Sequence, residues 1–209
     1  MNDHQLIHQS SSPEWYTPDD PYLRAVRACL GHIALDPASC EVANRVVQAE
    51  RIFTVADNGL ALPWIASTLY MNSPYGYEGA IDMRKTVNGE PNPLYQQWNP
   101  RLGRPNQRIW SQKLIDEHKS GNVMQAIMLC NAQTGENWFQ PLWAYPICFV
   151  DHRIPFYTIG ADGGMTNCKN GKSGPTHASV FVYFGPWEHR FETAFKHIGK
   201  FRWPNANYR

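Results

Sequence analysis

The sequence predicts a single α/β domain built on a mostly parallel sheet. Short apolar runs that suit buried strands alternate along the chain with segments whose apolar residues recur at helical spacing. The clearest apolar run, 69–71, stops abruptly at a polar turn. The length of 209 residues is sufficient for one such domain with a full core, but too small for a second large domain.

The bulk composition narrows the possible partners. The formal net charge is +1, so any contact with nucleic acid must come from local basic patches. The five cysteines contain no Cys-x-x-Cys pair and the eight histidines show no metal-binding spacing, so we expect free thiols, a reducing cytoplasm and no metal. No apolar run approaches membrane-spanning length, and the polar residues 1–12 do not resemble a signal peptide.

The first half of the chain supplies the first strands. After a flexible segment, 1–13, Thr17 and Pro18 precede two acidic residues and predict a helix start, with Thr17 as the cap and Pro18 in the first turn. The inward side chains of that helix are expected to be Tyr22, Val26, Cys29 and Leu30. The next elements are a strand over 32–36, a helix over 41–48, a strand over 51–54, a turn over 56–60 and the strand 69–72.

The second half is expected to complete the sheet. The segment 78–108 shows little periodicity, and a helix over 106–119 follows it. The remaining elements are a strand over 123–130, a helix over 134–143, a strand over 147–150, a Gly, Asn and Lys-rich loop over 157–177 and a strand over 178–184. The basic and aromatic residues 191–209 are a tail without an assigned role.

The turn Asn72-Ser73-Pro74-Tyr75 suits chemistry on an amine. The exocyclic amine of a nucleobase is a poor nucleophile because its lone pair is delocalised into the ring, so an enzyme that alkylates it must hold its N–H bonds. The Asn72 Oδ1 and the backbone carbonyl beside Pro74 can accept these hydrogen bonds, and Tyr75 can stack on an extruded base. Asn, Ser and Pro are also common turn formers, so an ordinary turn is the alternative.

Two acidic residues follow the first two predicted strands. In doubly wound sheets, ligands bind at the carboxyl ends of the strands. Asp36 lies at this position on the first strand, and the N–H groups of the helix that follows are close in sequence. Asp57 lies after the second strand, although Asp57-Asn58-Gly59 also suits a plain turn.

Basic residues concentrate in the irregular segment 78–108, where Tyr95 and Trp98 are interleaved with them. Basic side chains can contact phosphates while aromatic rings stack on bases, so this segment is either a DNA-facing insertion or a surface loop. Lys169 and Lys172 on the later loop can also contact DNA phosphate, with a solvated loop as the alternative.

Four motifs occur in one order: Trp15-Tyr16-Thr17-Pro18, Leu35-Asp36-Pro37-Ala38-Ser39, Asp57-Asn58-Gly59-Leu60 and Asn72-Ser73-Pro74-Tyr75. Together they resemble the phage-type DNA N6-adenine methyltransferases (Dam-like), and the resemblance runs from about Glu14 to Gly185. Two positions depart from the usual methyltransferase pattern. Ser73 stands where the family usually has a proline, and Ala38-Ser39-Cys40 replaces a Gly-x-Gly, as in the phage-type form that carries Asp-Pro-Ala and then an Asn, here Asn44.

The resemblance implies a Rossmann-like class I methyltransferase fold with an antiparallel edge hairpin, occupying 14–190 with a DNA-facing insertion at about 78–108. It implies methyl transfer from S-adenosylmethionine directly to the N6 amine of adenine in DNA, in a bacterial or phage-infected cell. The implied catalytic residues are Asn72, Pro74 and Tyr75. The implied cofactor-binding residues are Tyr16, Thr17, Pro18, Asp36, Pro37, Ala38, Asp57 and Asn72. The DNA-binding candidates are Arg84, Lys85, Arg101, Arg104, Arg108, Lys169 and Lys172.

Two other functions remain open from the sequence. Methyltransferases that act on RNA adenine, cytosine N4 or protein glutamine share the Asn-Pro-Pro-Tyr type of site. The departures at Ser73 and at Ala38-Ser39-Cys40 also leave room for a DNA-binding relative without catalytic activity.

Overall fold

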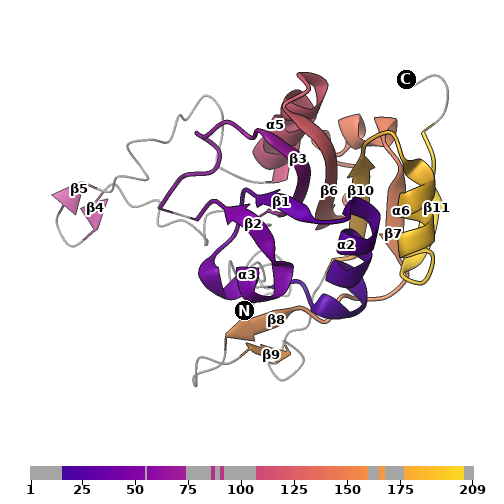
Figure 1. Ribbon diagram of the computed structural model, residues 1–209, viewed down its shortest axis with the longest axis horizontal. Coiled ribbons are helices and arrows are strands. Elements are labelled where there is room, and N and C mark those ends of the chain that lie inside the picture. Colours follow the sequence, from indigo (N-terminus) through magenta and orange to yellow (C-terminus); the bar gives the residue numbers. More distant parts are fainter. Residues whose placement is uncertain are drawn as a thin grey trace.

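The computed structural model describes residues 16–54, 56–73, 86–87, 90–91, 107–159, 165–167 and 177–204. Its centre is a seven-stranded sheet with the strand order β11-β7-β10-β6-β3-β1-β2 (Figure 1). The strands are β1 (Ile33–Asp36), β2 (Ala49–Ile52), β3 (Ala66–Asn72), β6 (Val123–Asn131), β7 (Ile147–Val150), β10 (Ser179–Phe184) and β11 (Gly199–Arg202). Two small antiparallel hairpins, β4 (Thr86–Val87) with β5 (Glu90–Pro91) and β8 (Tyr157–Ile159) with β9 (Met165–Asn167), lie outside this sheet.

The sheet is parallel in one half and mixed in the other. Strands β2, β1, β3 and β6 pair in parallel. Strand β10 is antiparallel to both β6 and β7, so β7 runs in the same direction as β6. Strand β11 pairs antiparallel with β7 and forms the edge. The chain is therefore a mixed α/β fold with its antiparallel strands on one side, as expected, but β10 is inserted between two strands of the opposite direction.

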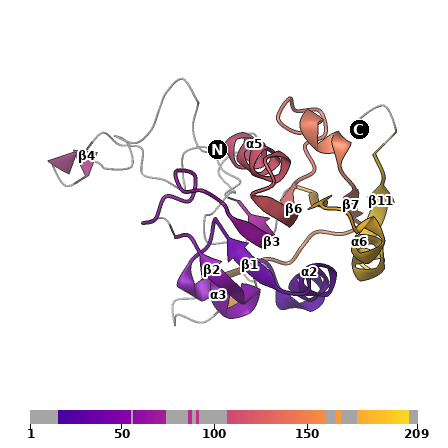
Figure 2. The same cartoon turned by 45° about the horizontal axis from the view of Figure 1, so that its top comes forward.

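Helices cover both faces of the sheet, as Figure 2 shows. The kinked helical turn η1 (Asp19–Leu23), α2 (Arg24–Leu30), α3 (Glu41–Val47) and α6 (Glu188–Phe195) contribute to one apolar cluster. The helix α5 (Gln107–Lys119) and the 3₁₀ turn η3 (Gln140–Ala144) contribute to the second cluster on the opposite face. Strand β6 belongs to both clusters, because Ile127 and Leu129 face the first and Met128 and Cys130 face the second.

Several expected elements have their expected positions. The inward side chains of the first helix, Tyr22, Val26, Cys29 and Leu30, are buried. The apolar run before Asn72 forms the end of β3, and the helix expected over 106–119 is α5. The expected strands over 123–130, 147–150 and 178–184 are β6, β7 and β10. The four cysteines in the described ranges, Cys29, Cys40, Cys130 and Cys148, are free thiols.

Other expectations were wrong in detail. Strand β2 lies two residues earlier than the expected 51–54, because its pairing with β1 runs from Ala49 to Ile52. The helix expected over 134–143 is a series of turns that ends in η3; Phe139 and Leu142 are buried as expected, but Pro141 lacks the N–H that an α-helix needs. The loop expected over 157–177 contains β8 and β9.

The carboxyl-terminal residues contribute to the sheet and its core. The expected boundary at residue 190 falls inside α6, whose Phe191 and Phe195 are fully buried against the sheet. Residues 199–202 then form β11 beside β7. Among the described residues, no helix combines the length and apolar character needed to cross a membrane.

Candidate active site at the carboxyl ends of β1 and β3

Two of the predicted site residues end neighbouring parallel strands. Asp36 is the last residue of β1 and Asn72 is the last residue of β3, and these strands pair through Leu35 and Leu69. Leu35 and Leu69 belong to the apolar cluster under α5, whereas Tyr70 belongs to the opposite cluster. Because side chains alternate along a strand, Asp36, Tyr70 and Asn72 project from the same face of the sheet.

Asp36 is a buried carboxyl group, with only 3% of its surface exposed. Burial raises its pKa to about 7, although a hydrogen bond from the Ala38 N–H acts in the opposite direction. The Ala38 N–H lies 3.2 Å from Asp36 Oδ1. No basic side chain offsets the burial of Asp36 within the described part of the chain, so this carboxyl is suited to a cationic group that arrives from outside.

The segment 16–18 contacts β3 and the loop that follows β1. The Thr17 hydroxyl and the Tyr70 hydroxyl form a buried hydrogen bond of 2.8 Å. Burial raises the pKa of Tyr70 far above its usual range, and the charge of Asp36 adds to this increase. Tyr70 and Asp36 lie on neighbouring strands, each one residue after the paired Leu69 and Leu35. Thr17 therefore bonds to β3, and its predicted role as a helix cap was wrong; Pro18, which is buried, precedes η1 instead of lying in its first turn.

Tyr16 is held on two sides. Its backbone N–H and C=O form a pair of 2.8 Å hydrogen bonds with Tyr157, and its hydroxyl lies 3.7 Å from Cys40 Sγ. Cys40 is the N-cap residue of α3 and accepts a hydrogen bond from the Ala43 N–H. The segment before η1 and the loop 37–40 after β1 thus contact each other, and the structure brings Tyr16, Thr17 and Asp36 together.

The turn with Asp57 packs against the same loop. The buried Trp64 donates its indole N–H to the Gly59 carbonyl at 2.7 Å. A Cβ atom on Gly59 would lie only 2.1 Å from the Pro37 carbonyl oxygen, so only glycine allows this approach. Asp57 itself is exposed, and hydrogen bonds from the N–H and hydroxyl of Thr54 lower the pKa of its carboxyl group. The Asp57 carboxylate therefore closes a local turn by accepting hydrogen bonds from Thr54.

The described part of the predicted amine site ends at Ser73. Asn72 is half-buried and is in register with Leu129 of β6. Ser73 is buried, and its hydroxyl has no hydrogen-bond partner in the described ranges. Pro74 and Tyr75 lie outside the described residues.

One of the candidate DNA-binding residues is placed by the structure. Arg108 is exposed in the first turn of α5. The other six candidates lie outside the described residues: Arg84, Lys85, Arg101, Arg104, Lys169 and Lys172. Apart from the gaps in the described ranges, no group of His, Cys, Asp and Glu side chains is arranged to hold a metal ion.

Sequence reasoning missed the roles of two residues of this region and gave a third, Asn44, no structural role. Tyr70 is two positions before Asn72, so strand alternation alone already placed it on the same face. Cys40 was considered as a free thiol and as a replacement for a missing glycine, and its position as the N-cap of α3 was not predicted. Asn44, which was matched to the phage-type motif, bonds to the N–H and C=O of Ala49 and fixes the turn from α3 to β2.

One comparison with known protein families gives a match. Residues 6–198 match the model of the family described as DNA N-6-adenine-methyltransferase (Dam). No curated protein and no solved structure matches the chain. The family match spans most of the sequence and includes the ends of β1 and β3, and the chain therefore belongs to the DNA N-6-adenine-methyltransferase (Dam) family.

Proposed function

We propose that the protein transfers a methyl group from S-adenosylmethionine directly to the N6 amine of adenine in DNA, on a Rossmann-like class I methyltransferase domain. One structural observation supports this most strongly. Asp36, Thr17 and Asn72 belong to segments that meet at the carboxyl ends of β1 and β3, where an α/β sheet binds its ligands. Membership of the Dam family supports adenine as the acceptor.

The residues around Asp36 fit the cofactor. The buried carboxyl lacks a cationic partner in the described chain, and S-adenosylmethionine carries an ammonium group that can provide one. We assign Tyr16, Thr17, Pro18, Pro37 and Ala38 to the walls of this site, because they contact or flank the loop after β1. We assign Asp57 to the adenine amine of the cofactor, on the resemblance of its motif.

The proposed chemistry assigns Asn72 to the amine of the substrate. S-adenosylmethionine supplies a methyl group that is already activated on a sulfonium centre. The task of the chain is then to align the amine and to stabilise the positive charge that develops on its nitrogen. Asn72 Oδ1 accepts one N–H bond of the amine, the carbonyl beside Pro74 accepts the second, and Tyr75 stacks on the flipped base.

We assign DNA contacts to the basic residues of 78–108 and to Arg108, Lys169 and Lys172. Charge reversal at Arg101 and Arg104 tests this, because each lost phosphate contact lowers the salt slope of DNA binding by about one. Fluorescence anisotropy at several salt concentrations measures the slope. An unchanged slope in the double variant would move the DNA to a different face.

Incorporation of label from methyl-tritiated S-adenosylmethionine tests the function as a whole. DNA, RNA and a protein mixture are offered in parallel, and we expect label in DNA alone, recovered as N6-methyladenine. Label in RNA, in cytosine or in protein would assign the enzyme to another amine. Cofactor binding without transfer to any acceptor would indicate a non-catalytic DNA-binding relative.

A further inference from the structure

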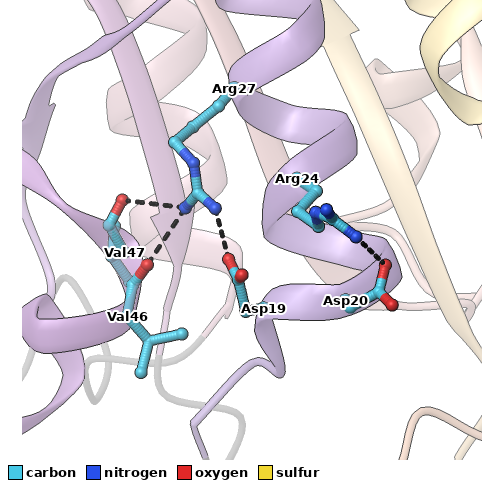
Figure 3. A network of polar contacts seen from close by, with 6 residues as sticks. All are labelled: Asp19, Asp20, Arg24, Arg27, Val46 and Val47. Atoms are coloured by element: carbon cyan, nitrogen blue, oxygen red, sulfur yellow. Dashed lines mark hydrogen bonds and ion pairs between the residues drawn. The ribbon is translucent and has the colours of Figure 1, made fainter.

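Arg27 joins three elements in the layer beside the candidate site. From α2, its guanidinium forms an ion pair with Asp19 in η1 and donates to the Val46 and Val47 carbonyls at 3.0 and 3.5 Å (Figure 3). These carbonyls belong to the last turn of α3. We call this set, Asp19, Arg27, Val46 and Val47, the Arg27 clamp.

Each element that Arg27 binds leads directly to one half of the candidate site. Asp19 follows Pro18, so η1 continues the segment 16–18 that contacts Tyr70 and Cys40. Helix α3 begins at the Cys40 cap, immediately after the loop that contains Asp36. The clamp therefore fixes the position of the segment 16–18 relative to the loop after β1, and the proposed cofactor site lies between these two segments.

The chemistry of the clamp suits a rigid connection. The carbonyls in the last turn of a helix lack intrahelical partners and carry the negative end of the helix dipole, which favours a cation. A guanidinium offers five N–H donors in a fixed plane, so one side chain can bind Asp19 and the α3 carbonyls together. Its side chain is only 22% exposed.

Helix α2 also contains Arg24, an arginine with which Arg27 can be compared. Arg24 forms an ion pair with Asp20 at 3.2 Å, but their side chains are 66% and 71% exposed and both lie on the η1–α2 segment. An exposed pair of this kind contributes little and connects no second element. Figure 3 shows both pairs, with Arg27 reaching toward α3 and Arg24 toward its own segment.

We propose that Arg27 is a positioning residue for cofactor binding: through Asp19 and the last turn of α3, it holds the segment 16–18 at the distance from the Asp36 loop that the cofactor requires. The inference rests on the proposed function, since it concerns the affinity of that same site for S-adenosylmethionine. Arg27 contacts neither the substrate nor the reacting atoms.

The test compares Arg27→Met, Arg27→Lys and Asp19→Asn with Arg24→Met in the full chain. Calorimetry with S-adenosylmethionine should give a dissociation constant about tenfold weaker for Arg27→Met, the loss expected for about one charge-assisted hydrogen bond. Arg27→Lys, which keeps the charge, should recover part of this loss, and Arg24→Met should bind like the wild type. With saturating cofactor, kcat and the KM for DNA should be unchanged in all variants. Urea unfolding without cofactor should show that each variant is folded, which separates weaker cofactor binding from general destabilisation.

Asp19→Asn keeps the contacts of Arg27 with α3 and removes only the charge of its other partner, so it tests the clamp even if Arg27→Met does not fold. Wild-type affinity in both Asp19→Asn and a folded Arg27→Met would overturn the clamp while leaving the proposed function intact. A wild-type protein that binds no S-adenosylmethionine would instead overturn the proposed function, and the positioning role with it.

Discussion

The Asp36→Asn variant should be more stable than the wild type, by a margin that grows as the pH rises, and it should bind the cofactor more weakly. The Asp36 carboxyl has an ordinary pKa of 3.8 and a pKa raised to about 7 in the folded protein by burial. Between these values the folded protein holds a proton that the unfolded chain has lost, so the free energy of unfolding decreases as the pH rises. Above pH 7 the folded protein contains a charged, buried carboxylate.

The two pKa values differ by about three, which corresponds to a destabilisation of at most about 4 kcal/mol above pH 7. Asparagine retains an oxygen that can accept the Ala38 N–H bond but carries no charge at any pH. The stability advantage of Asp36→Asn over the wild type should therefore grow by about 3 kcal/mol between pH 5 and pH 8. Such a difference shifts Tm by roughly 6–12 °C in a chain of this size.

Urea unfolding of both proteins at several pH values measures this difference, because the pH dependence of all other groups is common to the two. Asp57→Asn is the control: Asp57 is exposed and hydrogen bonds lower its pKa, so its substitution should bring no gain as the pH rises. Calorimetry should show weaker S-adenosylmethionine binding by Asp36→Asn. Parallel stability curves for the wild type and Asp36→Asn would refute the argument from burial.

Three further substitutions test other parts of the site. Asn72→Ala should lower the single-turnover methyl-transfer rate by about a hundredfold or more with unchanged cofactor affinity, and a wild-type rate would exclude the assigned role. Tyr70→Phe should leave the buried Thr17 hydroxyl without its partner and lower the free energy of unfolding by about 1–3 kcal/mol, whereas unchanged urea unfolding would contradict the importance of this bond. Gly59→Ala should be destabilising by about 1–3 kcal/mol, because its Cβ would lie 2.1 Å from the Pro37 carbonyl oxygen; thermal unfolding at the wild-type Tm would show that the turn moves freely.

The sequence predicted the strands and contacts that depend on local patterns. The apolar run before Asn72 ends β3 because those residues are buried in the sheet, and the helical spacing around Trp110 and Leu114 corresponds to α5. The same reasoning was wrong near Phe139 and Leu142. Their spacing is helical and both are buried, but neighbouring Pro141 favours a short 3₁₀ turn over an α-helix.

Contacts between residues far apart in the chain could not be predicted from local sequence patterns. The bond of Thr17 to Tyr70 joins residues 53 positions apart, and helix-capping rules consider only the nearest turn. The role of Gly59 depends on its approach to Pro37, which requires the tertiary structure. Strand β11 was not predicted, since residues 191–209 had no assigned role; the lack of a side chain on Gly199 allows its close contact with Phe149 of β7.

The position of β10 also determines the order in which the sheet can be completed during folding. Both neighbours of β7 in the sheet, β10 and β11, come later in the chain, and β10 is also the outer neighbour of β6. A growing or refolding chain can pair β2, β1, β3 and β6 first, but the open edges of β6 and β7 persist until residues 179–202 join. Unpaired edges of this kind recruit strands from other molecules. The carboxyl-terminal strands β10 and β11 thus cover edges of β6 and β7 that would otherwise be open to pairing with other molecules.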